Sequence, residues 1–239
     1  MVIFLASYST YWVRKPSPTC FDGLQNQNET GIDCGGVCQK ICKDQALPLI
    51  TRWAQVFPVR SGFADAAAYI VNPNPSFELT TVRYRFKIYD ADEQLVAERD
   101  GVTFVNAAEQ FIIYEPLIAV RERVIRRAFI ELTPQENLVW HRSGAGRLAQ
   151  FTLQDKTVSL DPVPTLSAAV HNNSAFDAKD VSAVGVLYDD HGNAMGVSAT
   201  KLDTVARLAD TPVLWTWPNP FLSPIASSEI YLHTPRLSQ

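Results

Sequence analysis

The feature that most constrains this chain is a run in which apolar and basic side chains strictly alternate. The run spans Thr81–Tyr89, and a period of two over this length predicts a β-strand with one buried face and one exposed face. Its apolar residues are Val82, Tyr84, Phe86 and Ile88, and its basic residues are Arg83, Arg85 and Lys87. Further strands are predicted at Ala66–Val71, Gly101–Val105, Gln110–Tyr114 and Ala128–Leu132.

The same pattern returns about 99 residues later in the chain. Val82–Asp90 corresponds to Val181–Asp189, and Tyr69–Asn74 corresponds to Ala168–Asn173. Both strands are followed by turn-forming Asp, Gly or Asn residues. Short strands at regular spacing, present twice, predict an all-β fold of two tandem antiparallel β-sandwiches of immunoglobulin type.

Four regions follow from this pattern. Hydrophobic residues make up 46% of the 239 residues and charged residues 19%, which is enough apolar material for packed cores. We expect the β-rich part to divide near Gln154–Lys156. The predicted regions are a membrane anchor or signal segment at 1–15, a cysteine-rich linker at 16–45, a first sandwich at 46–155 and a second at 156–239.

The N-terminus contains a short apolar run. Val2–Val13 is mostly apolar or aromatic and is followed by Arg14, Lys15 and a Pro-Ser-Pro hinge. A spanning helix needs about 20 apolar residues, and a signal peptide needs a basic start and a cleavage site that are missing here. We expect the end of a truncated single-pass anchor or an uncleaved signal. The alternative is a buried first strand.

All four cysteines lie close together, at Cys20, Cys34, Cys38 and Cys42. An even number of clustered cysteines in a Gly- and Asn-rich stretch predicts two disulfides, and three pairings remain open. Zinc is the alternative, but structural zinc sites favour two tight cysteine pairs, and this spacing offers one tight side and no neighbouring histidine.

The cysteine segment resembles a cysteine-rich repeat of bacterial surface and secreted proteins, written C-x-D-G-x-x-N-x-x-E-T-x-x-D-C-G-G-x-C. The matching residues are Cys20, Asp22, Gly23, Asn26, Glu29, Thr30, Asp33, Cys34, Gly35, Gly36 and Cys38. The last cysteine follows after three residues rather than two. The resemblance implies a secreted or envelope setting and no particular activity.

Each predicted sandwich resembles the FxLYD-type, late-embryogenesis-like modules of microbial envelope proteins. Phe86–Asp90 matches the signature with Ile in place of Leu, and Leu187–Asp189 keeps its second half, with Gly185 in place of the Phe. The resemblance implies immunoglobulin-fold binding or spacer modules that are not enzymes.

Five oxygen-bearing side chains gather inside the cysteine segment: Asp22, Asn26, Asn28, Glu29 and Asp33. Calcium takes six to eight oxygen ligands, which loops of Asn, Asp and Gly supply at tight turns. We expect one calcium ion here. The alternative is that these side chains bond their own backbone and form turns without metal.

No catalytic motif is present in the sequence. The histidines His141, His171, His191 and His233 are not paired at metal-ligand spacing, so we expect them in surface loops. The chain has no nucleophile elbow, phosphate-binding loop or dinucleotide fingerprint. We therefore predict no enzymatic activity.

Two other clusters are candidates for binding. Trp215 and Trp217 lie two residues apart on one strand face, where they stack on a glycan or else fill the core. The basic cluster is Arg121, Arg123, Arg126 and Arg127, which meets phosphates or acidic glycans or else keeps a strand edge charged.

These observations predict a non-enzymatic, membrane-tethered structural or interaction module outside the cytoplasm of a bacterial cell. Its expected partners are the membrane and other envelope proteins. The formal net charge of −4 argues against a nucleic-acid partner. The alternative is a glycan- or ligand-binding module that uses Trp215 and Trp217.

Overall fold

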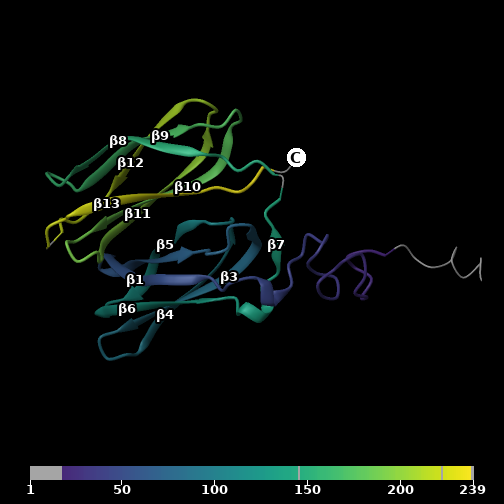
Figure 1. The fold of residues 1–239 in the computed structure, drawn as a ribbon. Coiled ribbons are helices and arrows are strands. Elements are labelled where there is room, and N and C mark those ends of the chain that lie inside the picture. The colour runs from purple at the N-terminus through teal and green to yellow at the C-terminus, as the bar shows by residue number, and fades with distance from the viewer. Residues whose placement is uncertain (1–17, 145, 222, 238–239) are drawn as a thin grey trace, which may run out of the picture.

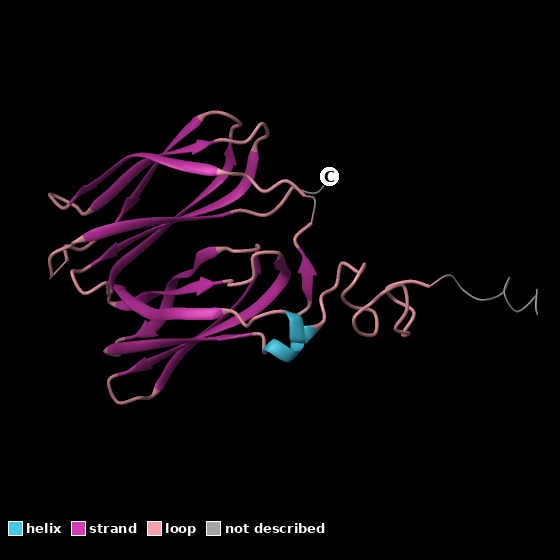
Figure 2. Ribbon diagram, viewed as in Figure 1, coloured by secondary structure: helices cyan, strands magenta, loops and turns pink. Residues whose placement is uncertain are grey.

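The computed structural model describes residues 18–144, 146–221 and 223–237, and the predicted anchor at 1–15 lies outside them. The described chain is all-β, as predicted, with two short 3₁₀ helices at Lys43–Gln45 and Gln135–Asn137 (Figure 2). Four sheets stack in layers and form two β-sandwiches (Figure 1). In the described part, no helix has the length and apolar character needed to cross a membrane.

The first sandwich pairs two antiparallel sheets, ordered β1-β2-β5 and β4-β3-β6, with the short β7 also paired to β3. β1 pairs with β2, and β3 pairs with β4, because a tight turn joins the two strands of each pair. Its strands are β1 (Ile50–Arg60), β2 (Gly62–Val71), β3 (Phe77–Asp90), β4 (Leu95–Val105), β5 (Gln110–Arg121), β6 (Ile125–Leu132) and β7 (Trp140–Arg142).

The second sandwich has the same two-sheet plan, with strand orders β12-β9-β8 and β11-β10-β13. Its strands are β8 (Phe151–Ser159), β9 (Thr165–Asn172), β10 (Ala178–Tyr188), β11 (Ala194–Val205), β12 (Asp210–Thr216) and β13 (Ser227–His233). Because β8 pairs with β9, the predicted boundary between 155 and 156 falls inside a strand of the second sandwich. The connection between the sandwiches is residues 143–150.

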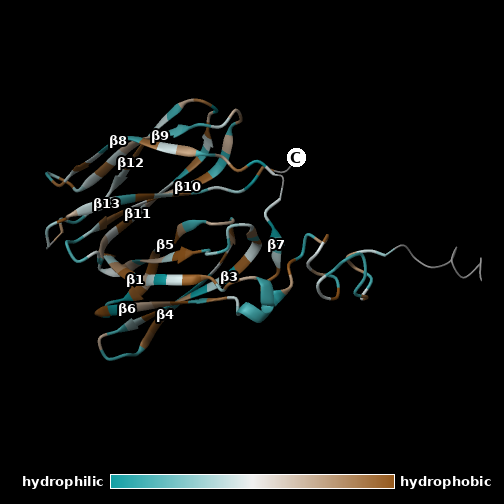
Figure 3. Cartoon of the chain, in the orientation of Figure 1, coloured by the Kyte–Doolittle hydropathy of each residue, from teal (hydrophilic) through white to brown (hydrophobic). Residues whose placement is uncertain are grey.

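The alternating run Thr81–Tyr89 lies within β3. Val82, Phe86 and Ile88 are at most 1% exposed and enter the first core, whereas Arg83 and Arg85 face solvent. This core also contains the fully buried Trp140 of β7. Apolar residues concentrate on the strands of all four layers in Figure 3.

The central strands β2 and β10 are buried on both faces. In β2, Ala66 and Ala68 face the first core, while Ala67 faces the second sandwich. In β10, Val181 faces the second core and Val184 faces the first sandwich. Both strands therefore read as nearly continuous apolar runs, since neither has a solvated face.

Each sandwich contains a buried asparagine whose side chain makes the same set of hydrogen bonds to the backbone. The Asn72 amide nitrogen donates to the carbonyls of Phe77 and Asn106, and its side-chain oxygen accepts from the Asn74 N–H. In the second sandwich, Asn172 takes this position. The match of Tyr69–Asn74 with Ala168–Asn173, which places Asn72 opposite His171, was therefore wrong by one residue at this position.

Asn172 makes the corresponding bonds within its own sandwich. Its amide nitrogen donates to the carbonyls of Phe176 and Val205, and its side-chain oxygen accepts from the Ser174 N–H. The turn after the central strand also has the same chemistry in both sandwiches. Asp90 accepts the N–H groups of Asp92 and Gln94, and Asp189 accepts those of His191 and Asn193.

Candidate functional site

The two predicted disulfides are present and join Cys20 to Cys38 and Cys34 to Cys42. No free cysteine remains in the described chain, so the zinc alternative is excluded. Gly36 adopts φ +55°, and a side chain there would bring Cβ to 1.9 Å from the Asn28 carbonyl oxygen. The Gly-Gly pair after Cys34 therefore lets the loop fold onto itself between the two bridges.

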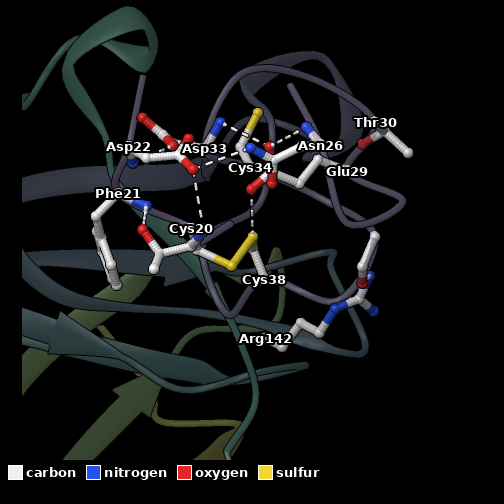
Figure 4. Close-up of a disulfide and its surroundings, with 12 residues drawn as sticks. Cys20, Phe21, Asp22, Asn26, Glu29, Thr30, Asp33, Cys34, Cys38 and Arg142 are labelled. Atoms are coloured by element: carbon white, nitrogen blue, oxygen red, sulfur yellow. Dashed lines mark hydrogen bonds between the residues drawn. A yellow bond between two sulfur atoms is a disulfide. The ribbon is translucent and has the colours of Figure 1, made fainter. Parts of the chain in front are cut away.

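The carboxylates of the loop accept backbone N–H groups (Figure 4). Asp33 accepts from Asp22 N at 3.0 Å and from Gly23 N at 2.9 Å. Asp22 in turn accepts from Thr19 N and from the Asn26 side-chain amide. That amide bond, together with the backbone donors, lowers the pKa of Asp22.

Glu29 is the one buried carboxylate of the loop, at 6% exposure. Its Oε2 accepts from Asn26 N at 3.2 Å and Asp33 N at 3.3 Å. Its Oε1 lies 3.0 Å from the sulfur of Cys38, which belongs to a disulfide. One oxygen of the carboxylate therefore holds the turn at Asn26, and the other lies in contact with the first bridge.

Four of the five predicted calcium ligands thus share one hydrogen-bonded network, while the side chain of Asn28 is exposed. The carboxylates of Asp22, Glu29 and Asp33 each accept two or more N–H groups, which is the turn alternative raised by the sequence, while the side-chain oxygen of Asn26 is buried without a partner. Calcium binding at these residues stays a prediction, and it requires that some of these bonds open.

The loop is fixed to the first sandwich at its C-terminal end. Ile41 is 2% exposed and belongs to the first core. Its N–H donates to the Trp140 carbonyl, and the Arg142 N–H donates to the Gln39 carbonyl. The Arg142 guanidinium also donates to the Gly36 carbonyl at 3.1 Å (Figure 4). The stapled loop is therefore an extension of the sheet through β7.

The outer surface of the loop carries large apolar side chains. Phe21 is 89% exposed, and three others are more than half exposed. These residues, which we call the loop apolar surface, are Phe21, Leu24, Ile32 and Val37. Exposed apolar side chains that gather on one small loop are typical of an interaction site, so we treat these four as a candidate.

The two tryptophans do not form an exposed pair. Trp215 is 1% exposed in the second core, and its Nε1 donates to the Ala183 carbonyl at 2.9 Å. Trp217 is 6% exposed and packs edge-on against Phe221. The core interpretation therefore holds for both rings, and the alternative that they stack on a glycan as an exposed pair is wrong, because both side chains are buried.

The prediction that the histidines lie in surface loops is wrong for His233, and His141 and His171 also lie on strands, β7 and β9. His233 lies on β13 and is 9% exposed. Its ring stacks between Phe104 and Phe111 of the first sandwich, at centroid distances of 4.0 and 4.5 Å. Its Nδ1 lies 2.8 Å from a carboxylate oxygen of Glu109. His233 is thus a side chain of one sandwich inserted into the other.

The sandwiches meet through the faces of β2, β5, β10 and β11, which form a third apolar cluster. Tyr188 and Tyr231 have hydroxyl oxygens 3.2 Å apart, and the Tyr231 ring lies 5.0 Å from that of Tyr69. Burial raises the pKa of both Tyr188 and Tyr231, so both hydroxyls stay protonated. The interface between the two sandwiches is therefore buried and apolar, like the core of a domain, and unlike a transient contact.

The C-terminal residues close the same interface at one end. The Arg236 guanidinium lies 2.7 Å from Glu78 of the first sandwich and donates to Ser143 and Gly146 of the connection. Asn106 of the first sandwich donates to the Thr234 carbonyl. The connection, the first sandwich and the last strand are therefore held together by charge-assisted hydrogen bonds.

The arginine cluster lies at the opposite end from the loop. Arg126 and Arg127 lie on β6, an edge strand of its sheet, and both are exposed. Arg123 lies 3.2 Å from the buried carboxylate of Asp90, and Arg127 pairs with Glu93. These pairs fit the expectation of a charged strand edge.

No family model matches this chain, and no curated protein matches it. Among solved structures, it is similar to the crystal structure of red sea bream transglutaminase, at 12% sequence identity and a TM-score of 0.28. That similarity covers 80% of this chain and 30% of the transglutaminase chain. At this TM-score the likeness carries no argument about fold or function.

Proposed function

We propose that this chain is a non-enzymatic structural or interaction module that works outside the cytoplasm, held to a membrane through its N-terminal segment. The observation that carries the proposal is the stapled loop, with two disulfides and an exposed apolar surface, fixed rigidly to β7. Disulfides of this kind persist in oxidising compartments, which supports an extracytoplasmic setting.

In this proposal, the loop apolar surface contacts another envelope protein, and the two sandwiches form the body that presents it. The shared contacts of Asn72 and Asn172, and of Asp90 and Asp189, support the view that the sandwiches are copies of one module. They also support the resemblance to tandem FxLYD-type modules.

The compartment is tested by trapping the thiols in living bacterial cells that express the chain. A maleimide added before reduction should leave Cys20, Cys34, Cys38 and Cys42 unmodified, because all four are paired. Protease added from outside the cells should digest the two sandwiches once the outer layers of the cell envelope have been permeabilised. Alkylation of all four cysteines without reduction would overturn the extracytoplasmic proposal.

The interaction surface is tested by photocrosslinking from the loop in the same cells. A photoreactive phenylalanine analogue at Phe21 should give a crosslinked product of defined mass, whereas the same analogue at the exposed Leu208 of the second sandwich should not. Equal crosslinking from both positions would contradict a role for the loop apolar surface.

A further inference from the structure

A cavity of about 310 Å³ lies between the two sandwiches, where β1 and β5 face β11 and the segment that follows β12. Its volume is at the lower end of the range of small-molecule sites, which is about 300 to 1,000 Å³. Both sandwiches contribute walls, so the cavity exists only while they are in contact.

Four aromatic side chains line this cavity: Phe57 and Tyr114 from the first sandwich, and Trp217 and Phe221 from the second. Their placement depends on Gly196 of β11. A Cβ at that position would lie 2.7 Å from Trp217 Nε1 and from two Phe221 ring atoms. The glycine therefore lets the two rings of the second sandwich close against β11 and form a wall.

Asp65 of β2 is the one charged side chain that lines the cavity, beside the uncharged polar residues Ser198, Thr216 and Asn219, and it is 7% exposed. Its Oδ1 accepts from the Leu117 N–H at 2.8 Å, and its Oδ2 accepts from the Tyr114 hydroxyl. Burial and this hydrogen bond raise the pKa of Tyr114, so the hydroxyl remains a donor. A carboxylate has about four lone-pair sites, so Asp65 keeps capacity for a further donor.

Asp65 has no cationic partner within the described parts of the chain, where every ion pair involves other carboxylates. Burying a carboxylate without a countercharge is costly, and that cost falls when a cation binds beside it. Aromatic rings around the same space attract a cation through their negative faces. The buried charge and the rings thus favour the same kind of ligand.

We propose that this cavity binds a small organic cation: an ammonium group against Asp65, joined to an apolar body that packs on the surrounding rings. Because the ligand contacts both sandwiches, its binding stabilises their interface against separation. The proposal concerns a site distinct from the cysteine loop and does not depend on where the protein resides.

The test compares phenethylamine with its neutral counterpart of similar shape, 2-phenylethanol, on the full chain near pH 7. Tryptophan fluorescence and calorimetric titration report binding, and the unfolding temperature reports interface stabilisation. We expect the amine to bind at least tenfold more tightly and to raise the unfolding temperature. Equal affinity for the two, or no binding of the amine at about 10 mM, would overturn the proposal.

Asp65→Asn tests the role of the charge. The asparagine keeps the size of the side chain; its Oδ1 can accept the Leu117 N–H and its Nδ2 can donate to the Tyr114 hydroxyl oxygen, so the fold should be kept while the tenfold preference disappears. Asp100→Asn is the matched control, because it removes an exposed carboxylate on β4 and should leave the preference intact. A preference that survives in Asp65→Asn overturns the proposal. If Asp65→Asn does not fold, the comparison of phenethylamine with 2-phenylethanol on the unchanged chain decides whether the proposal holds.

Discussion

At the scale of single residues, buried side-chain amides replace backbone pairing where the strands end. Asn172 is 0% exposed, and it satisfies two carbonyls and one N–H that would otherwise have no partner. A buried polar group left unpaired costs about 1 to 3 kcal/mol. The residue therefore fixes the path of the chain between β9 and β10 and the end of β11.

We predict that Asn172→Ala lowers the free energy of unfolding by about 2 to 4 kcal/mol, because it leaves these three backbone groups unpaired. Denaturant titration followed by fluorescence measures the change. The neighbouring Asn173→Ala is the control, because Asn173 is exposed and its loss should cost less than about 0.5 kcal/mol. Similar effects of both variants would show that the buried amide has no special role.

At the scale of elements, the cysteine loop and the sandwiches depend on different forces. The loop contains few buried side chains, whereas both cores are free of cysteine. Closing a loop of about 15 residues contributes roughly 3 kcal/mol in the chain-entropy model. The loop is therefore held by covalent bonds and turns, and the sandwiches by apolar burial.

We predict that reduction unfolds the loop and leaves the sandwiches intact. Hydrogen exchange followed by mass spectrometry should show faster exchange in residues 20–40 after reduction and unchanged exchange in β2 and β10. The intact mass should rise by about four hydrogens, since two bridges open. Faster exchange throughout β2 would mean that the first sandwich needs the disulfides.

A calcium titration separates the two explanations of the acidic loop residues. Because Asp22, Glu29 and Asp33 already accept backbone N–H groups, calcium must displace some of these donors, and loop amide resonances that stay unchanged at millimolar calcium would favour the turn explanation. Asp33→Asn is the comparison variant. Amide shifts of Asp22 and Asp33 that saturate with calcium, and that vanish in this variant, would instead support the calcium site predicted from the sequence.

The alternation in β3 was sufficient to predict the fold class, since a strand with one apolar face must belong to a sheet that covers a core. The boundary between sandwiches was less accessible, because the exposed residues of β8 give no apolar pattern. The contact between sandwiches did have a signal, namely the unbroken apolar runs in β2 and β10. If the runs in β2 and β10 are interpreted as strands buried on both faces, they predict that a second sheet packs against the outer face of each strand.

The candidate site was only partly predictable. Clustering of cysteines predicted the two disulfides, but the pairing depends on how the Gly-Gly turn brings Cys34 near Cys42. The spacing of Trp215 and Trp217 placed both rings on one face, and it left open whether that face is buried in the core or exposed to a ligand. His233 was missed because its partners, Phe104 and Glu109, lie more than 100 residues away in the sequence.

At the scale of the whole molecule, the two sandwiches share an interface that is held by specific contacts as well as by apolar area. His233 fills the space between two phenylalanine rings and bonds to Glu109, with both side chains 11% exposed. Domains joined by a large apolar contact move little relative to one another. We therefore expect the sandwiches to unfold as one unit.

We predict that His233→Ala lowers the free energy of unfolding by about 2 kcal/mol or more, because it opens a cavity and leaves Glu109 without its imidazole partner. Calorimetry should also show a broader transition as the two sandwiches become less coupled. His191→Ala, at an exposed turn, is the control and should melt like the unchanged protein. An unaltered transition in His233→Ala would show that the interface does not depend on this contact.

The pairing of Leu237 with Arg147, and of Ile41 with Trp140, brings both ends of the described chain to the same end of the stack (Figure 1). A mechanical load applied between these ends would not stretch the sandwiches in series. It would act first on the contacts of Arg236 with Glu78 and with Gly146 of the connection between the sandwiches. The contacts between the two sandwiches would then break one after another and not all at once.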